Sequence, residues 1–313
     1  MLSRSRALQK FLPFISLAVL FVALSIASPY FLTATNLSSV IRQTAVINTM
    51  ALGMTLVIVS GGIDLSVGSI LAFSGVMGTM TMVDSGSVLM GIAVGVACGA
   101  FWGFANGLMI SALRIPPFIV TLGTLGIVRG MSLVISGGLP VVGLPEEHSF
   151  LGEGSIGPVP FVLVVLAGCA VIMHFALHST KLGRYTYAIG SNEHAATYAG
   201  IAVGRYKVAI YALCGLLTGL AGMIETSRLM TGQPTAGVSY ELQVIAAVVI
   251  GGGSLAGGEG SVIGTLIGAF IMGLLSNGSD LLGVNPYWQQ VIIGAIIIMA
   301  VAVDQARKRR FAT

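Results

Sequence analysis

The chain has 313 residues, of which 55% are hydrophobic and only 8% are charged, and its mean hydropathy is +0.96. Soluble globular domains average about 25% charged residues, so this chain cannot cover a water-facing surface, and most of its exterior must face lipid. These values exclude a soluble catalytic domain, and the small net charge of +4 excludes a nucleic-acid-binding face.

Apolar runs long enough to cross a bilayer, or nearly so, recur along the whole chain. The predicted spans are residues 11–28, 40–60, 67–83, 88–113, 118–136, 159–177, 208–227, 242–253, 262–276 and 290–303. The first run resembles a signal peptide, but Pro29 follows it directly and no A-x-A site is present, which favours an uncleaved span. The sequence thus predicts an all-α membrane protein with about ten transmembrane helices in a single domain, residues 1–313.

Basic residues predict the orientation of these spans, because Lys and Arg concentrate in cytoplasmic loops. With the N-terminus inside and ten spans, the inner segments hold twelve of the fifteen Lys and Arg residues, including those of the 179–207 loop and the 307–310 tail. The outer 137–158 loop holds three glutamates and neither Lys nor Arg. Both termini are therefore expected in the cytoplasm.

Two of the apolar stretches are interrupted by glycine-rich turns, at 61–66 and 251–261. Each turn has a Gly-Gly pair followed by a Leu and then by Gly-Ser. Paired broken helices are typical of transporters built from two repeats around a central pathway, so the sequence predicts a two-half internal duplication. A chance likeness of glycine turns is the alternative. The sequence leaves open whether the turns are re-entrant or reach the cytoplasmic surface.

The only sizeable inner loop, 179–207, carries the signals of a short helix. Asn192 fits an N-cap, Glu193 lies in the first turn, where the helix dipole favours an anion, and Gly200 suits the helix end. Small side chains at Ala195 and Ala196 favour insertion into a groove of another protein. A plain connecting loop is the alternative.

Polar residues within or between the spans are candidates for lining a transport pathway. They are Asn48, Asp64, Ser66, Asn106, Thr121 and Gln243. Asp64 precedes a helix that Ser66 could cap, so its carboxylate either caps backbone N–H groups or lines a polar path. For the uncharged residues, hydrogen bonding between helices is the alternative. Arg129 lies within a span and is expected to reach the outer interface, or else to pair with a carboxylate.

Five glycines at four-residue spacing mark one face of the span 88–113. They are Gly91, Gly95, Gly99, Gly103 and Gly107. Bare backbone along one ridge predicts a tight packing seam with another helix. The three cysteines lie in apolar runs with neither metal nor disulfide spacing and are interpreted as small apolar fillers.

The chain carries no recognisable catalytic motif. None of its four lysines follows a Gly, so there is no G-x-x-x-x-G-K-[ST] phosphate loop, and HExxH and G-x-S-x-G are absent. The histidines, His148, His174, His178 and His194, are dispersed without metal spacing and are expected on the surface. Neither enzyme activity nor a bound cofactor or metal is predicted for this chain.

Further motifs cover nearly the whole chain. They read Gly53-Met-Thr-Leu-Val-Ile-Val-Ser-Gly-Gly-Ile-Asp64-Leu-Ser-Val-Gly-Ser69, Pro117-Phe-Ile-Val-Thr121-Leu, Lys181-Leu-Gly-Arg184-Tyr, Gln233-Pro-Thr-Ala-Gly237, Ile245-Ala-Ala-Val-Val-Ile-Gly251-Gly and Ser254-Leu-Ala-Gly-Gly258. Together they resemble the ribose-type monosaccharide permease family of ATP-binding-cassette importers. The run Glu193-His-Ala195-Ala196-x-x-x-Gly200 is similar to the coupling-loop motif of such permeases, with one residue inserted after Glu193.

The resemblance implies a channel-forming subunit in a bacterial inner membrane that imports a monosaccharide, with ribose first among the sugars. It implies a second permease copy forming a homodimer, a cytoplasmic ATPase that binds ATP and Mg, and a periplasmic sugar-binding protein, all at a lipid bilayer. It also implies that Glu193, Ala195, Ala196 and Gly200 dock on the ATPase.

Three alternatives remain at this stage. A permease of the same class could carry another solute, such as a branched-chain amino acid. An ion-coupled secondary transporter would need committed intramembrane carboxylates, for which Asp64 is the main candidate. A polytopic membrane enzyme would need a convergent cluster of His, Asp and Glu, which the sequence does not indicate.

Overall fold

The structure is a computed structural model that describes residues 2–312, with side chains described for residues 12–299 except Pro286, and for Ala302. Its α-helices are α1 (Leu2–Ala27), α2 (Ala34–Val59), α3 (Val67–Ser85), α4 (Val88–Ala112), α5 (Pro117–Ser136), α6 (Ser149–Glu153), α7 (Phe161–Ser179), α8 (Lys181–Ser191), α9 (Glu193–Tyr198), α10 (Val203–Leu229), α11 (Tyr240–Ile250), α12 (Val262–Leu281) and α13 (Pro286–Ala312). A 3-10 helix, η1 (Glu146–His148), and an antiparallel hairpin of β1 (Ser155–Ile156) and β2 (Val159–Pro160) lie between α5 and α7. The described chain is therefore nearly all-α, as predicted.

Local signals account for where several long helices begin and end. The side-chain oxygens of Thr33, Ser87 and Ser261 accept N–H groups of the first turns of α2, α4 and α12 at 3.1–3.3 Å. Such caps satisfy backbone donors that a helix start leaves unpaired. Gly86 and Gly137 end α3 and α5 in the left-handed conformation, which glycine adopts without a steric penalty.

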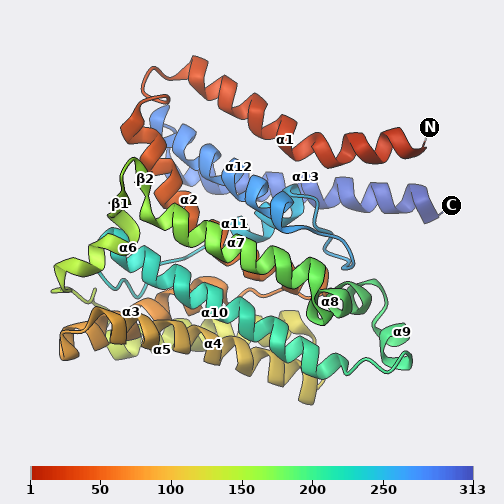
Figure 1. The fold of residues 1–313 in the computed structure, drawn as a ribbon, viewed down its shortest axis with the longest axis horizontal. Coiled ribbons are helices and arrows are strands. Elements are labelled where there is room, and N and C mark those ends of the chain that lie inside the picture. Colours follow the sequence, from red (N-terminus) through yellow and green to blue (C-terminus); the bar gives the residue numbers. More distant parts are fainter. Residues whose placement is uncertain (1, 313) are drawn as a thin grey trace.

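The helix α2 is the centre of the bundle. Every residue from 44 to 59 is buried, because α2 packs against α7, α10, α11 and α12. Figure 1 shows α3, α4, α5 and α10 on one side of it, and α1, α12 and α13 on the other. The largest hydrophobic cluster accordingly combines residues of α2, α7, α10, α11 and α12.

The glycine ridge of α4 packs mainly against α10, and at Gly91 against α3, which confirms the predicted seam. All five ridge glycines are buried. A Cβ added at Gly99 would lie 2.7 Å from the Cα and N of Gly219, and one at Gly103 would lie 2.9 Å from the Cα of Gly215. Backbones at this distance leave no room for a side chain, so close packing of small residues holds the two helices together.

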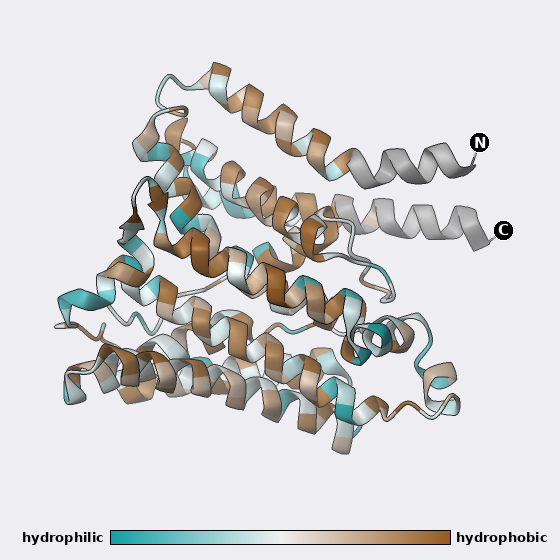
Figure 2. Cartoon of the chain, viewed as in Figure 1, coloured by the Kyte–Doolittle hydropathy of each residue, from teal (hydrophilic) through white to brown (hydrophobic). Residues whose placement is uncertain are grey.

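The helices run roughly parallel, so the bundle has two distinct ends. Both ends of the described chain lie at the same end of the bundle as α8 and α9, whereas η1, α6 and the β1–β2 hairpin lie at the opposite end (Figure 1). Figure 2 shows hydrophobic residues along the long helices and hydrophilic residues gathered on α8 and around η1. This distribution fits a bundle that crosses a bilayer along its helix axes.

Seven described helices are long and apolar enough to cross a membrane: α2, α3, α4, α5, α7, α10 and α12. Three shorter apolar helices, Leu12–Ala27, Tyr240–Ile250 and Tyr287–Met299, coincide with the remaining predicted spans. All ten predicted ranges thus fall on helices, while ten crossings stay a prediction.

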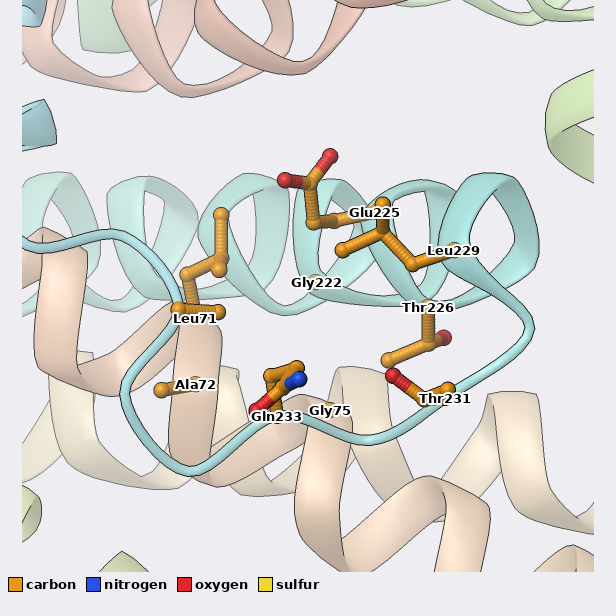
Figure 3. Close-up of a pocket in the computed structure, with 10 residues that line it drawn as sticks. Leu71, Ala72, Gly75, Gly222, Glu225, Thr226, Leu229, Thr231 and Gln233 are labelled. Atoms are coloured by element: carbon orange, nitrogen blue, oxygen red, sulfur yellow. The ribbon is translucent and has the colours of Figure 1, made fainter. Parts of the chain in front are cut away.

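The segment between α10 and α11, residues 230–239, is a loop made mostly of turns and runs along α3 and α10 (Figure 3). A Cβ added at Gly237 would lie 2.6 Å from the carbonyl oxygen of Gly68 in α3. Arg129 of α5 donates from Nη1 to the carbonyl oxygens of Pro234 and Ala236, at 2.7 and 2.8 Å. Arg129 therefore anchors this segment, and its place at the outer interface stays a prediction.

Candidate functional site

The predicted short helix of the 179–207 loop is α9. The side-chain oxygen of Asn192 accepts the N–H of Ala195 at 2.9 Å, which confirms the predicted N-cap. At the other end, Gly200 is left-handed (φ +82°) and the N–H of Ile201 donates to Ala196 O at 3.1 Å. This pairing closes a Schellman motif, so Gly200 ends the helix as predicted.

The residues of the coupling-loop motif differ in what their side chains contact. Both carboxylate oxygens of Glu193 accept from Lys207 Nζ in α10, at 2.7 and 2.8 Å, so this residue fixes α9 to its own chain. The Glu193 side chain is still 51% exposed, whereas Ala196 is turned inward and only 4% exposed. Ala195 and Gly200 are exposed, and they form the outward part of the motif.

Tyr198 is a residue of α9 that sequence reasoning missed. Its side chain is 89% exposed, the highest value among the large hydrophobic residues described. Tyrosine is enriched among the residues that dominate protein–protein interfaces. The available signal was an aromatic residue at the end of a helix with small side chains.

The two glycine-rich interruptions lie side by side, at the end of the bundle that carries α8. The N–H of Gly258 donates to Val59 O, at the end of α2, over 2.9 Å. Gly190 of α8 contacts both turns: a Cβ there would lie 2.6 Å from Gly258 N and 2.9 Å from the carbonyl carbon of Val59. The turns thus meet at the short helices between α7 and α10.

A buried network of hydrogen bonds starts in the first interruption and ties this turn to α4 and α5. Asp64 Oδ1 accepts from the N–H of Ser66 at 2.9 Å and from its hydroxyl at 2.5 Å. Asn106 of α4 donates to the Ser66 hydroxyl at 2.9 Å, and Thr124 of α5 donates to Asn106 Oδ1 at 2.7 Å. All four side chains are at most 1% exposed.

These hydrogen bonds correct the expectation for Ser66, while the pathway role of Asp64 stays a prediction. The Ser66 side chain makes no capping bond to α3, because its hydroxyl is given to Asp64. Asp64 itself accepts a backbone N–H, as a capping carboxylate would, while its Oδ2 is buried with no hydrogen-bond partner in the described part of the chain. Burying a carboxylate oxygen without a hydrogen-bond partner lowers the stability of the fold, so such a residue is a candidate for a functional role.

The other predicted pathway residues are partly gathered here. Thr121 lies next to these hydrogen-bonded residues, with its hydroxyl 3.4 Å from Ile63 O. Asn48 and Gln243 lie on α2 and α11, and no hydrogen bond joins them to Asp64 within residues 12–299. Thr124 was missed, although it shares a helix face with Thr121 three residues earlier.

A narrow crevice with both apolar and polar residues in its lining lies between α3, α10 and the 230–239 segment (Figure 3). Thr226 and Thr231 approach each other across it, and Gln233 lies against α3. It has room for about one water molecule. Near it, Glu225 is paired with Arg228 at 2.6 Å and accepts from Tyr240 at 3.1 Å.

His148 departs from the prediction that all four histidines are on the surface. Its side chain is fully buried, and its Nε2 lies 3.0 Å from the Thr226 hydroxyl of α10. The hydroxyl of Ser227 donates to His148 O and accepts the N–H of Gly152, so η1 and α6 are docked on the end of α10. Burial lowers the pKa of His148 to about 4. Its imidazole is therefore neutral at physiological pH.

The chain is similar in sequence to known permease proteins over almost its full length. Residues 36–301 match the family model described as "Branched-chain amino acid transport system / permease component". The chain is 48% identical to a ribose import permease protein of Bacillus subtilis (strain 168), over 96% of this chain and 94% of the relative. It is 44% identical to the ribose import permease protein of Escherichia coli (strain K12), over 94% and 93%. An L-arabinose transporter permease protein of Azospirillum brasilense is 39% identical over 93% and 86%. No solved structure matches the chain significantly.

Proposed function

The chain belongs to the family of branched-chain amino acid transport system permease components, and we propose that it is the membrane permease subunit of an ATP-binding-cassette importer for a monosaccharide, with ribose as the sugar. The observation that carries this proposal is the high identity, over almost the full length of both chains, to permeases named for ribose. The relatives' names favour a sugar over the branched-chain amino acid in the family description.

In this proposal the subunit performs no chemistry. The sequence carries no phosphate-binding loop, so ATP and Mg bind in a cytoplasmic ATPase subunit. A periplasmic binding protein delivers the sugar at the end of the bundle that holds η1 and the β1–β2 hairpin. A second copy of the permease completes the channel as a homodimer, surrounded by lipid.

The proposed orientation places both termini, α8 and α9 in the cytoplasm, with ten spans and a two-half duplication in one domain. Support comes from the common end shared by α8, α9 and both ends of the described chain (Figure 1). The basic residues Lys181, Arg184, Arg205 and Lys207 lie at this end, as expected for cytoplasmic loops.

The proposed pathway passes the buried, hydrogen-bonded side chains of Asp64, Ser66 and Asn106, and Thr121 lies beside them. Asn48 and Gln243 belong to the same proposal through their polar side chains on α2 and α11. An unpaired carboxylate oxygen buried at membrane depth destabilises the fold, and a role in a polar pathway explains why the residue is present. Thr124 joins this set because it donates to Asn106.

The proposed ATPase contact is the outward face of α9: Ala195, Tyr198 and Gly200. Glu193, which is exposed, holds α9 in place through its ion pair with Lys207, and Ala196 does so by packing inward. Compact side chains around one exposed tyrosine suit insertion into a partner's groove.

Reconstitution tests the proposal against the ion-coupled alternative. Proteoliposomes containing the chain, its ATPase and its binding protein are supplied with labelled ribose. Uptake that requires ATP and all three proteins is expected. Uptake driven by a proton gradient without the ATPase would contradict it and favour a secondary transporter.

A further inference from the structure

Three segments meet in one cluster at the end of the bundle that carries α8. They are residues 59–61 at the end of α2 and just beyond it, residues 187–191 in the last turn of α8, and residues 257–260 before α12. Gly61 and Gly190 also approach each other, because a Cβ at Gly61 would lie 3.8 Å from Gly190 Cα. Both helix interruptions are therefore in contact with the same short helix.

Gly190 makes this contact through its backbone. Any side chain at this position would overlap the Val59 carbonyl group and Gly258 N. On the facing turn, Gly257 and Gly258 are left-handed, with φ of +83° and +78°, and a Cβ at Gly257 would lie 2.6 Å from Gly190 O. Backbone against backbone leaves little freedom for the surfaces to slide.

Tyr187, one turn before Gly190 on α8, adds a side-chain link. Its hydroxyl donates to Gly260 O at 2.7 Å. Burial raises the pKa of Tyr187, so the hydroxyl keeps the proton that it donates. The hydrogen bond and the glycine contact lie on the same face of α8, and both reach the second interruption.

The contacts lead onward from this cluster into the membrane-spanning part of the chain. Beyond residues 59–61, the first interruption reaches Asp64, whose hydrogen-bonded chain ends on α4 and α5. Beyond Gly260, Ser261 caps α12. A displacement of α8 therefore has a packed route to α3, α4 and α5 on one side and to α12 on the other.

We propose that Tyr187 and Gly190 are positioning residues that join α8 to both interrupted spans, so that residues 59–61 and 257–260 move with α8 and α9 as one body. This inference rests on the proposed function, in which an ATPase displaces α9. The contacts of the cluster are with this chain itself, so they are separate from the proposed ATPase contact on α9.

The first test removes one hydroxyl. Tyr187→Phe is compared with Tyr185→Phe, a matched control on the same helix whose ring packs against Tyr206 and whose hydroxyl donates no hydrogen bond within residues 12–299. The readout in proteoliposomes with ATPase and binding protein is ribose imported per ATP hydrolysed. We expect Tyr187→Phe to lower this ratio about fivefold, the equilibrium effect of one ordinary hydrogen bond, with ATPase association unchanged. Equal ratios for both variants would overturn the inference.

The second test replaces the lost link with a covalent one. A Cβ at Gly258 would lie 3.4 Å from Ser191 Cβ, close to the 3.5–4.5 Å typical of disulfides. The Ser191→Cys/Gly258→Cys pair is therefore oxidised in the Tyr187→Phe background, and the disulfide is verified by mass spectrometry. Restoration of the import ratio supports movement as one body. A disulfide that blocks import in either background, with recovery after reduction, would show that α8 separates from the second interruption during transport.

The proposed function and the role of the cluster are contradicted by different results. If the unmodified chain shows no ATP-dependent ribose uptake, the proposed function is wrong. If it does show such uptake, and Tyr187→Phe matches Tyr185→Phe, only the role of the cluster is wrong.

Discussion

The seam between α4 and α10 gives a sharp test of the packing. Gly99→Ala would place a Cβ 2.7 Å from the Cα and N of Gly219 and closer still to Gly215 O. These are backbone atoms, so no side chain can rotate away, and α4 must move from α10 by several tenths of an ångström to reach an ordinary contact. Overpacking of this kind costs about 1–3 kcal/mol.

Gly168→Ala in α7 is the matched control. It is the same substitution in a long apolar helix, but nothing lies within 4 Å of the added Cβ. We expect a lower thermal unfolding midpoint in detergent for Gly99→Ala, measured by size-exclusion chromatography after heating, and an unchanged or higher midpoint for Gly168→Ala. Equal midpoints for both variants would refute the claim that the glycine ridge is a fitted seam.

Four further outcomes are expected. Asp64→Asn should reduce ribose uptake more than membrane insertion, because it changes a buried carboxylate of the proposed pathway; normal uptake would leave the residue as a turn-forming group only. Cysteines placed at Ser155 and Ser191, which are both exposed, should react with impermeant reagents from opposite sides of the membrane, and labelling from one side would contradict the orientation. Tyr198→Ala should reduce co-purification of the ATPase with a normally inserted permease, and unchanged recovery would remove this residue from the interface. The pKa of His148 is about 4 in the folded protein, against an ordinary value of 6.5. Between these values the unfolded chain binds a proton that the folded chain does not. The free energy of unfolding should therefore be highest above pH 6.5 and fall by up to about 3 kcal/mol as the pH drops towards 4. His148→Gln should flatten this dependence of the unfolding midpoint on pH, and an unchanged slope would assign it to other groups.

Features set by neighbouring residues were predictable from the sequence. The N-cap at Asn192 and the helix end at Gly200 depend on bonds that reach only a few residues along the chain. The ridge of α4 followed from its four-residue glycine period, because that spacing marks one helix face.

Features set by distant contacts were not predictable. Gly190 meets Val59 and Gly258, which are far away in the sequence, and His148 is buried because Thr226 of α10 pairs with it. The inward turn of Ala196 likewise depends on how α9 sits on its own chain. A single sequence records the residue types but not these pairings.

The most direct test of the central claim is ATP hydrolysis by the assembled complex. The ATPase is measured in proteoliposomes with and without this chain, while the binding protein is supplied empty or loaded with ribose. The account predicts that ribose-loaded binding protein stimulates hydrolysis only when the chain is present, and that labelled ribose accumulates in the same vesicles. The account would be contradicted if the rate of ATP hydrolysis were the same with empty and ribose-loaded binding protein, or if ribose accumulated without the ATPase.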